Sequence, residues 1–432
     1  MKCKKALLLA LLLLPAGLLR GESGKALPKS DIEYLTGVYK ATFDGIIFFV
    51  NDKTGLPYDV SDFRKATSTS NIGLYMASIA VGSKTGLISK EDALRKLDLA
   101  LTSLEKIQKW NGFPVTWVNV DTLQRDFGPS FSYADHVGNL VCGLLVVEGI
   151  FPKEFGKRID AYVKPMQFLT AYDPATGWLK GGYNIEKKDF DINQPWGKWY
   201  YNIFAADTRP FSLIGITLKQ IPETHWDKLN RSTDAGSAVD TELKGGGSAV
   251  YYWPGIEGGG MFMQFLPGIF LPETGLAMGE SAKNFAGAQL EYSKKKGYYP
   301  LWGVSASEAP DGKSYLGWGG MRLDVITPHA SVLAIGYYPS EAVENLKELE
   351  SRGMRPVYES GGKKYDFGFT DSYDIHSSTC SKNYLLLDQG MLFLSLANYL
   401  DKDVVRESFG ASPLGKKSVK TLEKLENKRF LK

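Results

Sequence analysis

Apolar residues recur every three to four positions along most of the chain, the spacing that places them on one face of an α-helix. The predicted helices come in pairs whose members are joined, in most cases, by a short link. Links between successive pairs are longer, about 20 to 30 residues. The pairs are residues 67–85 with 89–109, 131–150 with 155–171, 200–220 with 223–231, 256–267 with 279–296, 324–337 with 339–352, and 382–400 with 401–408.

The alternation of short and long links predicts how the pairs are arranged. Consecutive antiparallel helices closed into a ring place every long link on the same rim, and loops of that length usually carry function. We therefore predict an all-α fold, an (α/α)6 toroid of six helical hairpins with long loops on one rim and a site in its mouth. An open helical solenoid is the alternative.

One helix start is visible in the local sequence. Ser89 followed by Asp92 resembles a capping box in which Asp replaces the usual Glu. The leucines that follow repeat at helical spacing and predict a core-facing stripe, with no chemistry implied: Leu94, Leu97, Leu101 and Leu104.

The first residues indicate export. Three lysines precede an apolar run over residues 6–14, and Pro15 to Gly17 follow it, the pattern of a secretory signal peptide. The run is too short for a membrane span, and no Cys follows it to accept a lipid. We predict a signal peptide over 1–23, a single domain over 24–432, and a secreted or periplasmic protein without a membrane span.

Composition narrows the class of partner. A formal net charge of +3 with 23% charged residues indicates neither nucleic-acid nor membrane binding. The sequence does not decide whether Cys142 and Cys380 form a disulfide, and it does not decide the oligomeric state. The histidines, His136, His225, His329 and His376, show no paired metal spacing, so neither a metal site nor a cofactor is predicted.

Aromatic and polar residues gather in the predicted loops, most densely in Pro300–Gly312 (PLWGVSASEAPDG). A pyranose packs its C–H face on an aromatic ring while its hydroxyls reach polar groups, so these loops suggest carbohydrate binding. The candidate sugar platforms are Tyr252, Trp253, Trp302 and Trp318, and burial in the core is the alternative for each.

Several motifs occur in the order found in the glycoamylase-like family. They are TSTSNIGLYMASIAVGSKTGLIS from Thr67, YADHVGNL from Tyr133, AADTRP from Ala205, GGMFMQFLPGIFLPETG from Gly259, PLWGVSASEAPDG from Pro300, and LLLDQG from Leu385. The chain thus resembles this family, which includes exported β-1,2-glucanases and the processing domain of cyclic β-1,2-glucan synthases. The resemblance implies the (α/α)6 toroid and a glycoside hydrolase acting on glucan.

The resemblance also implies roles for individual residues. In the Tyr133 motif, Asp135 and Asn139 correspond to family positions, with one extra residue between them. Asp207 stands where the family has Glu and is the candidate acid, while Arg209 is retained. Glu308 and Asp371 are candidates for the base, and Asp135 is a further catalytic candidate. Residues assigned to orient sugar or water are Asn139, Arg209, Gln264, which stands where relatives commonly have Glu, and Asp388.

These residues have structural alternatives as well. Asp207 could pair with Arg209 or cap a helix, and Asp135 and Asp388 could also mark helix starts. The leading hypothesis is a secreted hydrolase of a β-linked glucan, with inversion of the anomeric carbon implied by the resemblance. A protein that holds an oligosaccharide or polysaccharide without cutting it is the second, and a polysaccharide lyase the third.

Overall fold

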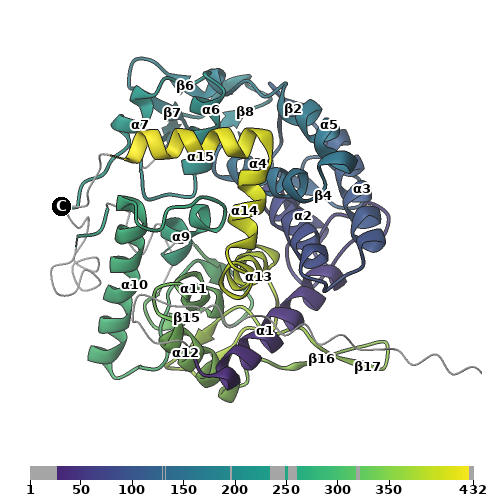
Figure 1. Ribbon diagram of the computed structural model, residues 1–432, viewed down its shortest axis with the longest axis vertical. Helices are drawn as coiled ribbons and strands as arrows, with labels where there is room; N and C mark the ends of the chain where they lie inside the picture. The colour runs from purple at the N-terminus through teal and green to yellow at the C-terminus, as the bar shows by residue number, and fades with distance from the viewer. Residues whose placement is uncertain are drawn as a thin grey trace, which may run out of the picture.

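The computed structural model describes residues 27–128, 130–131, 133–194, 197–233, 249–251, 260–317 and 322–427. Its helices form two concentric layers (Figure 1). The predicted signal peptide over 1–23 lies outside the described residues. Among the described residues, none of the helices combines the length and the apolar character that a membrane span requires.

The inner layer consists of helices that are buried on nearly every side. Neighbouring members contact each other in the order α13, α2, α4 and α6 on one side and α9, α11 and α13 on the other. Their bounds are α2 (Thr69–Lys84), α4 (Ala134–Ile150), α6 (Arg209–Thr217), α9 (Met261–Phe270), α11 (Pro328–Leu333) and α13 (Leu386–Leu400).

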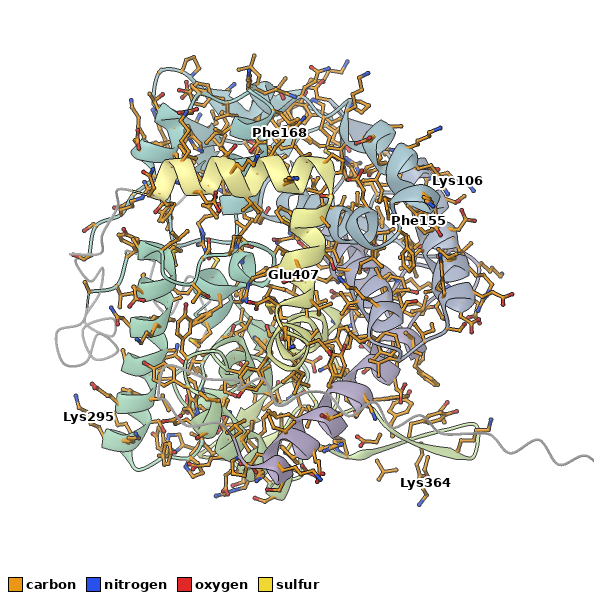
Figure 2. All side chains as sticks on the ribbon, in the orientation of Figure 1. Lys106, Phe155, Phe168, Lys295, Lys364 and Glu407 are labelled. Atoms are coloured by element: carbon orange, nitrogen blue, oxygen red, sulfur yellow. The ribbon has the colours of Figure 1, made fainter. Side chains whose placement is uncertain are left out.

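The outer layer consists of helices with one buried face and one solvent face. Its members are α1 (Lys29–Phe48), α3 (Lys90–Lys106), α5 (Pro152–Val163), α7 (Thr224–Lys228), α10 (Ala277–Lys296) and α12 (Pro339–Ser351). In Figure 2, Lys106 and Lys295 project outward from this layer. The predicted (α/α)6 toroid is confirmed.

The closing partner of the last inner helix differs from the prediction. Residues 401–408 were expected to pair with 382–400, but α1 packs against α13 and α2 and so completes the ring. Helix α14 (Val404–Ala411) contacts α2, α4, α9 and α13, so it covers one end of the inner layer. Helix α15 (Pro413–Glu426) then crosses α4 and α6 (Figure 1).

Glycines allow the inner helices to approach closely. A Cβ atom added at Gly143 would lie 2.1 Å from the carbonyl oxygen of Gly73, where α4 crosses α2. A Cβ at Gly138 would lie 2.7 Å from the backbone nitrogen of Phe211, where α4 meets α6. No side chain fits at either crossing, so these positions fix the spacing of the inner layer.

Two further predictions hold at α3. The Ser89 hydroxyl accepts a hydrogen bond from the Asp92 backbone N–H at 3.0 Å, so the predicted cap is confirmed. In the leucine stripe, Leu97, Leu101 and Leu104 are fully buried.

Short antiparallel strands, which the all-α prediction did not include, occupy the long links. Their bounds are β1 (Ala66–Ser68), β2 (Lys109–Trp110), β3 (Phe113–Pro114), β4 (Trp117–Asn119), β5 (Ser130–Phe131), β6 (Tyr172–Asp173), β7 (Trp178–Lys180), β8 (Tyr183–Asn184), β9 (Asp189–Phe190), β10 (Asn193–Gln194), β11 (Gly197–Lys198), β12 (Tyr200–Tyr201), β13 (Ser307–Glu308), β14 (Tyr315–Leu316), β15 (Val325–Ile326), β16 (Val357–Ser360), β17 (Lys363–Asp366), β18 (Tyr373–Asp374) and β19 (Thr379–Cys380). The β16–β17 hairpin, which carries Lys364, projects from the ring (Figure 2).

The long links run from the ends of outer helices to the starts of inner helices. Residues that line one cavity come from several of these links and from the first turns of α4, α9 and α13. The long loops therefore share one rim, as predicted. Cys142 and Cys380 are free thiols, so the disulfide that the sequence left open is not formed.

Candidate active site

A cavity of about 380 Å³ lies at the N-terminal ends of the inner helices. This volume falls within the usual range for small-molecule sites. Side chains from most of the ring line it: Asp59, Val60, Arg64, Ser68, Ser70, Asn71, Trp117, Asp135, His136, Asn139, Asp207, Phe262, Leu266, Glu308, Gly312, Ser314, Tyr315, Leu385 and Leu387. Carboxylates thus meet there from segments far apart in the sequence.

Asp207 lies in the turn that leads into α6 and is 9% exposed. Burial and the negative charge of Asp135 raise the pKa of Asp207 to about 8, while Arg209 opposes the shift. At neutral pH this carboxyl therefore holds its proton, as a general acid requires.

Glu308 ends the short strand β13 and is 4% exposed. Its Oε1 accepts hydrogen bonds from the Asn383 amide at 2.8 Å and from Arg64 Nη2 at 3.3 Å. Burial raises the pKa of Glu308 above its ordinary 4.5, and the Asn383 and Arg64 donors limit the rise. Glu308 Oε2 is itself buried and has no hydrogen-bond partner among the described residues.

Asp59 is a cavity carboxylate that the sequence did not reveal. Its Oδ1 accepts a hydrogen bond from the Asn71 amide at 2.7 Å. Burial raises the pKa of Asp59 to about 6, with Asn71 and Arg64 opposing and Asp62 and Glu308 adding to the rise. Asp59 and Arg64 lie in the loop between α1 and α2, where no motif marks them.

The start of α4 supplies Asp135, His136 and Asn139. The Asp135 side chain is 26% exposed, and its Oδ1 accepts from the backbone N–H of His136 at 3.0 Å. The Asn139 amide donates to the Asp135 carbonyl at 2.7 Å, whereas Asn139 Oδ1 has no partner among the described residues. Asn139 lines the cavity, and its buried Oδ1 keeps an unused capacity to accept a hydrogen bond.

Two aromatic side chains line the cavity without having been predicted. Trp117, in β4, packs edge-on against the exposed Phe127, with ring centroids 5.2 Å apart. Tyr315, in β14, is 52% exposed, yet burial of its hydroxyl end and the charges of Asp388, Asp371, Asp59 and Asp207 raise its pKa. Tyr315 is thus a cavity residue whose hydroxyl is influenced by several carboxylates.

Arg209 does not reach the cavity, which corrects its assignment to sugar binding. Its side chain is fully buried and pairs with Glu273 through Nε to Oε1 and Nη2 to Oε2, each at 2.9 Å. It also donates to the carbonyls of Phe204, Ala206 and Gln264. The pair joins α6 to the link that follows α9, and Asp207 has no ion pair with Arg209.

Replacement of Glu273 by Gln is therefore expected to lower the free energy of unfolding by about 3–5 kcal/mol, because it leaves the buried guanidinium without its counter-charge. Urea unfolding measures the change. The matched control is Glu223→Gln, which breaks an exposed ion pair with Lys424 and should cost no more than about 1 kcal/mol. Equal losses in the two variants would contradict a role for the Arg209–Glu273 pair in holding the ring.

Gln264 is likewise not among the residues that line the cavity of Asp207 and Glu308. It is fully buried, accepts from the Ser281 hydroxyl at 3.4 Å, and borders a second cavity of about 410 Å³ among α9, α10, α13 and α14. The carboxylates of that cavity, Glu273 and Asp403, are each paired with an arginine. Neither is left for proton transfer, so we place the candidate active site in the first cavity.

Of the four predicted aromatic platforms, Trp302 is the one that lies within the described residues, and it does not line the cavity. Trp302 is 1% exposed, its indole N–H donates to the Glu341 carbonyl at 3.0 Å, and it packs edge-on against Tyr338. It is a core residue, which was the alternative stated for it. Tyr252, Trp253 and Trp318 lie outside the described residues.

Asp371 and Asp388 lie behind the cavity wall rather than on it. Asp371 is 1% exposed, and its Oδ2 accepts from the Glu308 backbone N–H at 2.6 Å. Asp388 is 2% exposed and lies beside His329. Asp371 therefore supports the strand that carries Glu308, and neither Asp371 nor Asp388, which the sequence predicts as a base and a sugar-orienting residue, is among the residues that line the cavity.

Comparison with known proteins confirms the resemblance predicted from the motifs. Residues 227–413 match the Glycoamylase family model, described as "Putative glucoamylase". The cyclic beta-(1,2)-glucan synthase NdvB of Rhizobium meliloti (strain 1021) is 26% identical over 266 residues, which are 58% of this chain and 9% of that protein.

Solved structures share the fold, two β-1,2-glucanases among them. The endo-beta-1,2-glucanase from Chitinophaga pinensis, in a complex with sophorotriose and glucose, has a TM-score of 0.73 and 18% identity over 92% of this chain and 98% of that chain. The beta-1,2-glucanase from Parabacteroides distasonis has a TM-score of 0.74 and 17% identity over 92% of this chain and 60% of that chain. At 18% and 17% sequence identity, the similarity shows that this chain shares the toroidal fold of these enzymes.

Proposed function

We propose that the protein is a glycoside hydrolase that cleaves a β-linked glucan, with linear β-1,2-glucan as the first candidate. The observation that carries the proposal is that Asp207, whose pKa is raised to about 8, and Glu308 line the same cavity. Hydrolysis of a glycosidic bond requires such a pair of carboxyl groups on either side of the bond. The family match and the β-1,2-glucanase structures support glucan as the substrate.

In the proposed mechanism Asp207 donates its proton to the glycosidic oxygen as the bond from that oxygen to the anomeric carbon breaks. Glu308, ionised, takes a proton from a water molecule whose oxygen bonds to the same carbon. Exchange with solvent then returns Asp207 and Glu308 to their starting states. Asp59, in the same cavity, is the alternative base.

Sugar contacts in this proposal come from groups with free hydrogen-bonding capacity and from exposed rings. Asn139 Oδ1 accepts from a hydroxyl, and Trp117 offers an aromatic face at the cavity wall. Arg64 is the one Arg or Lys among the described lining residues. It donates to Glu308 and to Asp62, which holds it at the cavity edge beside the base.

A second candidate function is binding without cleavage. It is favoured by Asp207, because a carboxylate one methylene shorter than the Glu of the family motif is withdrawn by about 1.5 Å from the oxygen it must protonate. Such a protein would hold an oligosaccharide in the same cavity and leave it intact.

Incubation of the purified protein with linear β-1,2-glucan, laminarin, cellulose oligomers and starch tests these functions. The hydrolase predicts new reducing ends and shorter products from at least one glucan. Binding by calorimetry without products would favour the second candidate. Products that absorb in the ultraviolet would indicate a lyase instead.

The pH dependence follows from the two carboxyls. Glu308 must be ionised, so activity is expected to fall as pH drops through its raised pKa. Asp207 must be protonated, so activity is expected to fall again as pH rises through about 8. A profile of kcat/KM between pH 4 and 10 measures both limbs. Full activity at pH 10 would exclude Asp207 as the acid.

We also propose that cleavage inverts the anomeric carbon, as the family resemblance implies, and that the protein is exported. Proton NMR of the first products distinguishes the two anomers and so tests inversion. The lysines and the apolar run of residues 2–14 support export. The N-terminal sequence of the protein recovered from the producing cells tests it.

A further inference from the structure

Three side chains converge behind the wall of the active-site cavity. The ligand atoms of His329, Asp371 and Asp388 all lie within 4.8 Å of one another. All three residues are almost completely buried, with exposed fractions of 1%, 1% and 2%. They come from segments far apart in the sequence, which is why the spacing of the histidines predicted no metal site.

The backbone holds these residues firmly in place. His329 is in the first turn of α11 and Asp388 in the first turn of α13, and the two helices pack against each other. The backbone N–H of Asp371 donates to the Asn383 carbonyl and to the Ser381 hydroxyl, each at 3.1 Å. The cluster is therefore preformed.

Few partners are available to the polar atoms of the cluster. Neither ring nitrogen of His329 makes a hydrogen bond to the described residues. The carboxyl groups of Asp371 and Asp388 are hydrogen-bonded to each other, which requires a proton between them, and Oδ1 of Asp371 and both oxygens of Asp388 meet no other donor among the described residues. The contact from His329 Nδ1 to Asp388 Oδ2 is 3.5 Å, longer than an N–H···O hydrogen bond. Buried ring nitrogens without a partner are costly, and two facing carboxyl groups need a proton or a cation between them, so a bound proton or ion is indicated.

We propose that His329, Asp371 and Asp388 bind a first-row divalent transition-metal ion, for which Zn²⁺ is the probe. Two carboxylates balance the charge of such an ion, and an imidazole ligand favours Zn²⁺ or its neighbours over Mg²⁺ and Ca²⁺. Tetrahedral ligands about 2.0 Å from zinc lie roughly 3.3 Å apart. The 3.5 Å separation of His329 Nδ1 and Asp388 Oδ2 fits that spacing.

A proton shared between the two carboxyls is the alternative occupant. Burial and the negative charge of nearby carboxylates raise the pKa of Asp371 to about 7, so one shared proton is available near neutral pH. That proton satisfies one oxygen on each carboxyl and leaves both nitrogens of His329 unpaired. A metal ion satisfies a nitrogen and both carboxyls together, and for that reason we favour it.

The ion would position the base of the active site. Asp371 Oδ1 accepts from no described donor outside the cluster and so can bind the metal, whereas Oδ2 accepts from the Glu308 backbone N–H at 2.6 Å. The Ser372 hydroxyl in turn donates to the Glu308 carbonyl. Fixing Asp371 therefore fixes the strand that presents Glu308 to the cavity.

Metal uptake by the full chain tests the proposal independently of any glucan cleavage. Protein treated with a chelator and then dialysed against Zn²⁺ is expected to retain one equivalent per chain by mass spectrometry, with a higher Tm than the chelated form. His329→Gln and Asp388→Asn should each lower the affinity at least about 10-fold. The matched control is His376→Gln, which removes an exposed His that lies 3.6 Å from Asp324 and should leave uptake unchanged.

The outcomes separate clearly. If wild-type protein takes up neither Zn²⁺ nor Mn²⁺ and its Tm is the same with and without chelator, the cluster holds a proton and the proposal is overturned. Retention of a full equivalent by both His329→Gln and Asp388→Asn would place any bound ion elsewhere and would overturn it as well.

Discussion

Asp207→Asn is expected to lower kcat on the cleaved glucan by about 10²- to 10⁴-fold, the usual contribution of a general acid. Asparagine keeps the shape of the side chain and its place at the entry to α6, but it has no proton to give to the departing oxygen. Reducing-end assays under single-turnover conditions measure the loss. Wild-type turnover in this variant would remove Asp207 from the mechanism.

The thermal stability of Asp207→Asn at two pH values tests the raised pKa of Asp207 independently of activity. Because the pKa of Asp207 is about 8 when folded and near 3.8 when unfolded, the folded protein binds the proton more tightly, and the wild type loses stability as pH rises from about 4 to 8. The asparagine side chain of the variant does not titrate in this range. Asp207→Asn should therefore raise Tm by about 2 °C or more at pH 8 and leave it little changed at pH 4.

Replacement of Asp135 tests whether Asp207 is the group that sets the alkaline limb of the pH profile. Its negative charge raises the pKa of Asp207, so Asp135→Asn should lower that pKa. The alkaline limb of the kcat/KM profile would then move to lower pH. A limb that stays in place would mean that another group sets it.

The ring was predictable because its helices carry regular apolar spacing. The segments of α2 and α3 were placed correctly to within a few residues. Helix α3, buried on one face, shows the helical period, whereas α2, buried on nearly all sides, is a long run of small and apolar residues. Helix α1 has apolar residues at the same spacing, among them Leu35, Val38 and Phe43, but was not assigned. Which helix closes the ring against α13 depends on tertiary contacts, and periodicity carries no information on them.

The site was predictable only where motifs mark it. Asp207 and Glu308 were found through motifs, whereas Asp59 and Trp117 lie in links whose local sequence has no signature. The sequence also did not reveal which of the candidate sugar-binding side chains are buried in the core. Arg209 and Trp302 have the residue types that bind sugar, but both are held in the core by hydrogen bonds to residues distant in the sequence, which form only in the folded chain.

Replacement of Glu308 by Gln is the second large effect, with an expected 10²- to 10⁴-fold loss of kcat, because an amide cannot take a proton from the attacking water. The fold should tolerate it, since the glutamine oxygen still accepts from the Asn383 amide, which is 2.8 Å from Glu308 Oε1. Asp59→Asn, measured alongside, distinguishes the two candidate bases. If Glu308→Gln retains wild-type kcat and Asp59→Asn loses it, the base is Asp59.

Arg64 connects this assignment to the pH profile. Its guanidinium lowers the pKa of Glu308. Removal of the positive charge in Arg64→Gln should raise that pKa, and the acid limb of kcat/KM should then move to higher pH. Asp62→Asn is the matched control, because Asp62 pairs with Arg64 but does not line the cavity, and its negative charge raises the pKa of Glu308. It should move the limb the opposite way, and shifts in the same direction would exclude Glu308 as the titrating base.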